Sequence, residues 1–169
     1  MAQSTSERIL DAAESRLRRG GYNGFSFRDL AEDIGIKSAS VHHHFPTKEA
    51  LAIKLAERYT AQFLEALKTA PKGRARVAVY RALFRASLED DGKMCLCGML
   101  GAEISALPPG VIDKTRAFFE AIGTDLSAHL DSADPADEAM TILARLEGAL
   151  ILGRAYGDIA RFDQATQDL

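Results

Sequence analysis

Long apolar runs are what this sequence most plainly lacks. No stretch of about 18 apolar residues occurs among its 169 residues, so we expect no transmembrane helix and no membrane partner. The first twenty residues, MAQSTSERILDAAESRLRRG, are charged and amphipathic, without the apolar centre of a secretory signal peptide. The composition, 47% hydrophobic and 27% charged, is that of an ordinary soluble globular protein. A cytoplasmic location is therefore expected.

Cysteine is also scarce. The sequence has two, Cys95 and Cys97, and a single intervening residue is a poor spacing for a structural disulfide. Two thiols alone cannot complete a four-ligand zinc site. A reducing compartment is the simpler expectation. Core packing, lining of a ligand pocket and redox sensing remain open as roles for this pair.

No excess of positive charge marks a nucleic-acid surface. The formal net charge is −3. Residues 1–60 carry nine Lys and Arg against eight Asp and Glu, whereas residues 61–169 carry twelve against sixteen. The first third is only slightly basic, so charge alone does not predict DNA binding.

No alternating strand pattern is present, and the apolar periodicity is helical throughout. Thr5 or Ser6 is expected to cap a first helix that ends at Gly20 and Gly21. Further helices are predicted at about residues 27–34, 38–45, 48–68, 74–90, 96–106, 110–131 and 136–158, with a short final helix after them. The sequence contains no nucleophile–base pair, phosphate-binding glycine loop or metal-spaced cluster, so no enzyme and no cofactor are expected.

The second and third predicted helices have the layout of a helix-turn-helix. Ser26, with Asp29 three residues later, forms a capping box that opens the first of the two, and Gly35 ends it. The next helix begins near Lys37 or Ser38 and ends at Pro46. The apolar residues expected to hold this pair against the first helix are Leu30, Ala31, Ile34, Ile36, Val41 and Phe45.

The other face of the third helix is left free to meet a ligand. Its small residues Ser38, Ala39 and Ser40 suit an element that approaches base edges in a major groove about 12 Å wide. Phosphates can be met by hydroxyls, by backbone N–H groups at helix starts, and by Lys or Arg. Thr47 with Lys48, and Ser26 with Arg28, offer these groups at the starts of two helices.

Three consecutive histidines, His42, His43 and His44, raise the alternative of a metal site. Consecutive side chains on a helix point about 100° apart, so the three cannot converge on one ion. The fourth histidine, His129, is distant in the sequence. We therefore expect no metal site here.

At this point the segment FSFRDLAEDIGIKSASVHHHFPTKEAL resembles the N-terminal DNA-binding domain of the TetR family of bacterial transcriptional regulators. The resemblance is close over residues 5–55 and extends to the remainder only in its helical layout. It implies an all-α fold with a helix-turn-helix domain at residues 1–50. A long fourth helix would join this to a C-terminal helical domain at residues 51–169 that binds an effector and dimerises.

The resemblance also assigns roles by position. Ser38, Ala39 and Ser40 fall where relatives approach bases, and His42 stands where an aromatic residue, usually tyrosine, touches DNA. His43 is the next DNA-facing position, and Lys48 matches a lysine that meets a phosphate. Lys37 replaces the usual serine or threonine cap. The full predicted DNA-binding set is Ser26, Arg28, Lys37, Ser38, Ala39, Ser40, His42, His43, His44, Thr47 and Lys48.

The resemblance also implies two sets of site residues in the C-terminal domain, one for an effector pocket and one for a dimer interface. Residues that could line an effector pocket are Tyr80, Phe84, Met99, Glu103, Phe118, Phe119 and Ile122, although most would be plain core in any helical bundle. Small and apolar residues at helical spacing predict a dimer interface, since relatives dimerise through their last long helices: Leu146, Ala149, Leu150, Gly153 and Gly157. The alternative for this stripe is a helix packed within one chain.

The expected protein is thus a homodimeric transcriptional regulator, most simply a repressor. Its partners would be a pseudo-palindromic double-stranded operator and a small-molecule effector that releases it, with the fourth helix as the lever. The alternative is a DNA-binding regulator without a small-molecule effector, controlled by a protein partner or by the redox state of Cys95 and Cys97.

Overall fold

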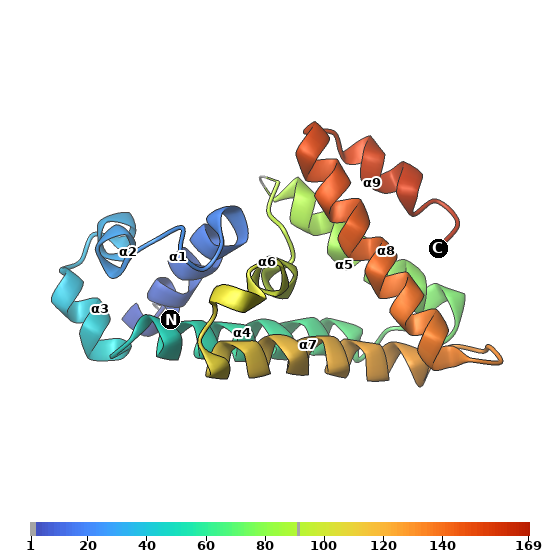
Figure 1. Cartoon of the computed structure of the whole chain (residues 1–169), viewed down its shortest axis with the longest axis horizontal. Helices are drawn as coiled ribbons and strands as arrows, with labels where there is room; N and C mark the ends of the chain where they lie inside the picture. Colours follow the sequence, from blue (N-terminus) through green and yellow to red (C-terminus); the bar gives the residue numbers. More distant parts are fainter. Residues whose placement is uncertain (1–2, 91) are drawn as a thin grey trace. The chain divides into compact units, whose positions relative to one another are not determined.

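In the computed structural model, residues 3–90 and 92–169 are described, and every regular element in them is helical (Figure 1). This confirms the predicted all-α class. The elements are α1 (Thr5–Gly20), α2 (Phe27–Ile34), α3 (Ser38–His44), α4 (Lys48–Leu67), α5 (Arg74–Glu89), α6 (Leu96–Ala102), the 3₁₀ turn η1 (Ile104–Ala106), α7 (Pro109–Ser127), α8 (Pro135–Tyr156) and α9 (Ile159–Ala165). None of these helices is long and apolar enough to cross a membrane.

The chain divides into two compact units. The first comprises Met1–Tyr59 and Leu96–Arg116, and the second comprises Thr60–Cys95 and Ala117–Leu169. The predicted division at residue 50 placed α6, η1 and the start of α7 in a C-terminal domain, whereas they belong to the first unit. Helices α4 and α7 each continue from one unit into the other.

The first unit is built around one apolar centre. Ser4, rather than the expected Thr5 or Ser6, caps α1 by accepting the Glu7 N–H. The helices α1 to α4 then bring together buried side chains whose transfer from water contributes roughly 1.5–3 kcal/mol for each large residue. These are Ile9, Leu10, Ala13, Leu17, Leu30, Ala31, Val41, Phe45, Leu51 and Leu55.

Charged contacts at the edge of this centre fix how α1 lies against its neighbours. The guanidinium of Arg58 on α4 donates to Asp11 (2.7 Å) and Glu14 (2.9 Å) of α1. Arg16 donates through two nitrogens to the Asp33 carboxylate at the end of α2, at 2.5 and 2.8 Å. This bidentate geometry gives more directional restraint than a single contact would.

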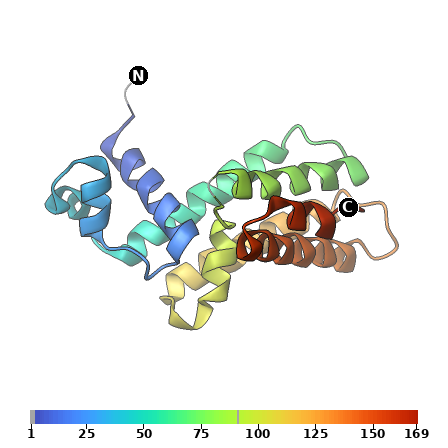
Figure 2. The same ribbon diagram turned by 90° about the horizontal axis from the view of Figure 1, so that it is seen from above.

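The second unit has an aromatic centre. Phe63 of α4 lies 5.7 Å from the Tyr80 ring, 5.8 Å from Phe84 and 5.6 Å from Phe118, measured between ring centroids. The four rings meet at tilted or edge-to-face angles, which their quadrupoles favour. Helices α8 and α9 lie side by side at this unit (Figure 2), and Phe162 of α9 is fully buried.

A buried arginine joins the end of α4 to α5 and α7. Arg76, with a side chain only 5% exposed, donates to both oxygens of Asp125 (2.9 and 2.6 Å) and to the Ala70 carbonyl (2.9 Å). Tyr80 donates its hydroxyl to Asp125 at 2.7 Å. Burial alone would raise the pKa of Asp125, but hydrogen bonds from Arg76 and Tyr80 outweigh it and hold the pKa below its usual value.

Candidate nucleic-acid interface

The turn between α2 and α3 is fixed by local backbone chemistry. Ser26 accepts the Asp29 N–H (3.3 Å), and the Asp29 carboxylate accepts the Ser26 N–H (2.6 Å), completing the predicted capping box. The hydrogen bonds from Ser26 lower the pKa of Asp29. Gly35 ends α2 in the left-handed region, with φ 68°, where glycine alone is free of the Cβ penalty. These features set the angle at which α3 leaves the turn.

Helix α3 is held by one side and open on the other. Val41 is fully buried and Phe45 nearly so, and together they anchor the helix to the core. Ala39, His42, His43 and His44 are exposed, whereas Ser38 and Ser40 are half-buried. Lys37 occupies the cap position without a side-chain hydrogen bond, as expected from its replacement of serine or threonine.

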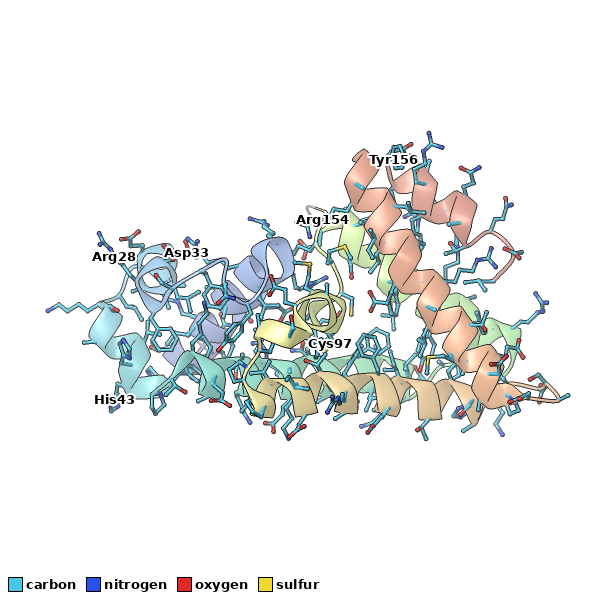
Figure 3. The ribbon with its side chains drawn as sticks, in the orientation of Figure 1. Arg28, Asp33, His43, Cys97, Arg154 and Tyr156 are labelled. Atoms are coloured by element: carbon cyan, nitrogen blue, oxygen red, sulfur yellow. The ribbon has the colours of Figure 1, made fainter. Side chains whose placement is uncertain are left out.

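The three histidines have different surroundings. His42 meets the Phe27 ring edge-on, with ring centroids 4.7 Å apart at an interplanar angle of 65°. His43 and His44 instead lie against each other, 5.5 Å apart at 73°, and the exposed His43 is labelled on α3 in Figure 3. The imidazole of His42 is thus positioned by an aromatic wall, while those of His43 and His44 form an exposed pair.

A concavity gathers much of the predicted DNA-binding set. It measures about 440 Å³ and lies where α2, α3 and α4 begin. Its lining consists of Phe25, Ser26, Phe27, Arg28, Ser38, His42, Thr47 and Lys48. Six of these were predicted from the sequence, and the two phenylalanines, Phe25 and Phe27, were not. Their signal was available in GYNGFSF, where aromatic residues flank the capping serine.

Lys48 and Thr47 reach this concavity from the start of α4. Thr47 accepts the Ala50 N–H at 3.0 Å, which caps the helix. The Lys48 ammonium donates to the Phe25 carbonyl and lies 5.0 Å from the Tyr22 ring centroid and 4.4 Å from that of Phe25. Burial lowers the pKa of Lys48, and the negative charges of Asp29 and Glu103 act in the opposite direction.

Arg28 lines the concavity but is held only loosely, and other predicted residues lie outside it. Arg28 also pairs with Glu32 one turn along α2, at 3.1 Å, and its side chain is 84% exposed (Figure 3). Such a surface pair contributes little to stability. Its guanidinium is therefore able to exchange this partner for a phosphate. Ala39, Ser40, His43 and Lys37 lie on α3 or its cap without lining the concavity.

Several known proteins similar to this chain are transcriptional regulators. Residues 9–55 match the family model described as bacterial regulatory proteins, tetR family. The crystal structure of a TetR transcriptional regulator from Legionella pneumophila is 31% identical, with a TM-score of 0.90 over 97% of this chain and 94% of that one. The chain belongs to the TetR family. It is accordingly a transcriptional regulator with a DNA-binding domain.

Two curated HTH-type regulators are more distant in sequence. The HTH-type transcriptional regulator CymR of Pseudomonas putida is 27% identical, with 96% of this chain and 86% of that protein covered. IcaR of Staphylococcus epidermidis, a negative transcriptional regulator of the biofilm operon icaADBC, is 23% identical, with 73% of this chain covered. The matched region spans 66% of the length of IcaR.

The residues predicted to line an effector pocket of this TetR-family chain fall into two groups. Tyr80, Phe84, Phe118 and Ile122 are buried at the aromatic centre of the second unit, and Phe119 is half-buried against Phe118. Met99 and Glu103 belong to the first unit. Glu103 accepts the backbone N–H of Tyr22 at 2.7 Å, a long-range contact that no sequence pattern indicated.

Of the residues predicted for the dimer interface, Leu146, Ala149, Leu150 and Gly153 are buried within the TetR-family protomer, whereas Gly157 is exposed. Leu146 and Leu150 have no exposed surface, Ala149 has 1%, and a Cβ added at Gly153 would lie 2.7 Å from Leu88. Gly157 is the left-handed cap that ends α8. The large apolar residues of α8 that stay exposed are Met140 (62%), Ile151 (57%), Leu152 (47%) and Tyr156 (67%). We call these four the open α8 face.

Proposed function

We propose that this TetR-family regulator is a repressor that binds a pseudo-palindromic operator as a homodimer and leaves it when a small molecule binds the second unit. The observation that carries the DNA-binding part is the concavity at the starts of α2, α3 and α4. It combines hydroxyl, imidazole and ammonium groups with helix N-termini, the groups that bind phosphates. The description of IcaR as a negative regulator supports repression as the sign of control.

The exposure of side chains along α3 suggests which residues read bases and which bind phosphates. Ala39, His42 and His43 are exposed, and the small Ser38 and Ser40 beside them leave the backbone near the surface. Base edges in the major groove would be read by this face, while Lys48, Thr47 and Ser26 hold the phosphate backbone. His44 and Lys37 would contact the flanking backbone, and Arg28 would add a phosphate contact.

A homodimer is supported by the open α8 face. A helix that exposes Met140, Ile151, Leu152 and Tyr156 along its length gains free energy when a second apolar surface covers it. Tyr156 lies at the end of α8 (Figure 3). A second copy of the chain would supply the same surface in a symmetric pairing. Two α3 helices would then enter half-sites about one DNA turn, roughly 34–36 Å, apart.

The effector would bind among the aromatic side chains of the second unit. Phe63, Tyr80, Phe84 and Phe118 would provide largely apolar contacts, with Asp125 and Arg76 as polar groups nearby. The effector must bind the conformation that misfits DNA more tightly than the one that fits, because only a difference in affinity shifts the equilibrium. The Phe63 contacts involve α4, which continues from the DNA-binding unit.

The deciding experiment is selection of bound genomic fragments, followed by footprinting of the recovered operator. A protected pseudo-palindrome with half-sites one turn apart supports the proposal. Lys48→Ala should weaken binding to every sequence and make its salt dependence shallower, whereas Ser40→Ala should change base preference within a half-site. Lys54→Ala is the matched control, since Lys54 is an exposed α4 lysine that pairs with Glu57 at the surface. Equal effects of Lys48→Ala and Ser40→Ala on all sequences would refute the assigned roles.

The second candidate is a regulator without a small-molecule effector. Screening metabolites for thermal stabilisation and for loss of operator binding separates the two, because a ligand of the folded state must raise its stability. Operator binding that no metabolite alters would favour control by a protein partner or by thiol oxidation. Cys95 and Cys97 are 1% and 0% exposed, which argues for packing over reaction with a dissolved oxidant. Equal operator affinity of wild type and a Cys95→Ser/Cys97→Ser variant under oxidant would exclude the redox alternative.

A further inference from the structure

Glu103 makes a contact that the proposed function does not use. It follows α6 and caps η1, and its Oε2 atom accepts the backbone N–H of Tyr22 at 2.7 Å. Tyr22 lies in the loop between α1 and α2, 81 residues earlier in the chain but in the same compact unit. A carboxylate hydrogen-bonded to a partly buried N–H is a strong, directional attachment.

Gly21 shapes the loop to receive this carboxylate. It has φ 78°, in the region that favours glycine, and its N–H donates to the Leu17 carbonyl at the end of α1. A Cβ atom at this position would lie 2.0 Å from Glu103 Oε1 and 2.8 Å from Oε2. A side chain at position 21 would therefore displace the Glu103 carboxylate from its present position.

The same loop holds Lys48 on its other side. Tyr22 and Phe25 present their ring faces to the Lys48 ammonium, and the Phe25 carbonyl accepts a hydrogen bond from it. The loop from Gly21 to Phe25 thus contacts the Glu103 carboxylate at its start and the Lys48 ammonium along its length. Its conformation determines where that ammonium lies relative to the concavity that it lines.

We propose that Glu103 is a positioning residue for DNA binding: by seating the α1–α2 loop, it places the Lys48 ammonium where a phosphate can be bound. This rests on the proposed role of Lys48 as a phosphate ligand. When a phosphate enters the concavity, it replaces the Phe25 carbonyl as the acceptor of the hydrogen bond from the Lys48 ammonium. Withdrawal of Glu103 frees the loop, so Lys48 is no longer held at the edge of the concavity and the phosphate contact weakens.

The test measures affinity and salt dependence in parallel. The probe is a fluorescein-labelled, mixed-sequence 30-base-pair duplex, since non-specific binding is almost entirely contact with phosphates. Fluorescence anisotropy between 50 and 200 mM salt gives the affinity and the slope of its logarithm against log salt. Lys48→Ala should reduce the slope by about one for each protomer bound. Glu103→Ala should produce most of the same reduction, with an affinity loss of roughly fivefold to tenfold at 100 mM salt.

Three variants separate positioning from a merely structural role. Glu103→Gln keeps an oxygen that can accept the Tyr22 N–H, so its affinity should stay within about threefold of wild type. Gly21→Ala displaces the carboxylate and should match Glu103→Ala. In the Lys48→Ala background, Glu103→Ala should have little further effect, because the group that it positions is absent. Glu120→Ala, which removes an exposed α7 carboxylate, is the charge control.

These measurements distinguish failure of the positioning role of Glu103 from failure of the phosphate role of Lys48. Fully additive losses in the double variant, or an affinity loss in Glu103→Ala with an unchanged salt slope, would overturn the positioning role while leaving the function of Lys48 intact. A Lys48→Ala protein that binds with wild-type affinity and slope would instead refute the phosphate role itself, and the positioning role with it. If Glu103→Ala fails to fold, Glu103→Asp takes its place, because its shorter side chain cannot keep the same loop contact.

Discussion

The buried carboxyl group of Glu147 makes folding of this protein dependent on pH, and Glu147→Gln should remove that dependence. Although the residue as a whole is half-buried, its Oε1 atom is shielded from solvent and has no hydrogen-bond partner among the described residues. Burial raises the pKa of Glu147 from 4.5 to about 7, and a hydrogen bond with Cys95 opposes the shift in part. The difference between these two pKa values corresponds to roughly 3 kcal/mol.

The direction of this pH dependence follows from the protonation of Glu147 in the folded and in the unfolded chain. Below pH 4.5 the group is protonated in both the folded and the unfolded chain, and it adds no penalty. As pH rises from about 4.5 to 7 the unfolded chain releases the proton while the folded chain retains it, so the free energy of unfolding decreases. Above pH 7 both forms are ionised and the full penalty of about 3 kcal/mol remains. Glutamine has no charge to desolvate, so the free energy of unfolding of Glu147→Gln should not decrease in this way.

The assay is urea denaturation at pH 5 and pH 8 with protomer concentration held constant, since a dimer's stability depends on it. Glu147→Gln should be more stable than wild type by about 3 kcal/mol at pH 8 and by less than about 1 kcal/mol at pH 5. Glu120→Gln, at an exposed position, should show no such difference. An identical effect of Glu147→Gln at both pH values would refute the reasoning, because desolvation of a charge cannot act where the charge is absent.

Three further changes test other parts of the molecule. Ile151→Glu places a charge on the open α8 face and should convert the dimer to monomers in sedimentation experiments, whereas Ala66→Glu, at an exposed α4 position, should not. Asp125→Asn leaves the Arg76 guanidinium buried without its anion and should lower the free energy of unfolding by about 3 kcal/mol in urea titrations; a loss below 1 kcal/mol would show that the pair is dispensable. Gly35→Ala meets no atom within 4 Å, so backbone strain alone should cost about 1–2 kcal/mol, and an unchanged thermal midpoint would contradict this.

The DNA-binding head was largely predictable because its signals are local. The capping box at Ser26, the left-handed Gly35 and the break at Pro46 set the limits of α2 and α3 within one residue of those expected. Each of these signals depends on neighbours within four residues, so the sequence alone contains the information. The same reasoning missed the cap of α1 by one position, since Ser4, Thr5 and Ser6 are all competent caps.

Contacts between distant segments were not predictable in this way. Helix α8 has apolar residues on most of its circumference, so periodicity could not tell whether Leu146 and Ala149 or Met140 and Ile151 face the protomer's interior. The attachment of Glu103 to Tyr22 joins residues 81 positions apart. Its only trace in the sequence is a glycine at position 21, which a helix end explains equally well.

Burial of both thiols has a practical consequence for measuring the dimer in solution. Because Cys95 and Cys97 are the chain's only cysteines and are shielded, the native surface offers no reactive thiol to a maleimide label. A cysteine introduced at Asn23, an exposed loop position beside α2, would take up label alone and once per protomer. Distances between two such labels, by spin or fluorescence methods, would then follow the spacing of the two heads with and without operator or effector.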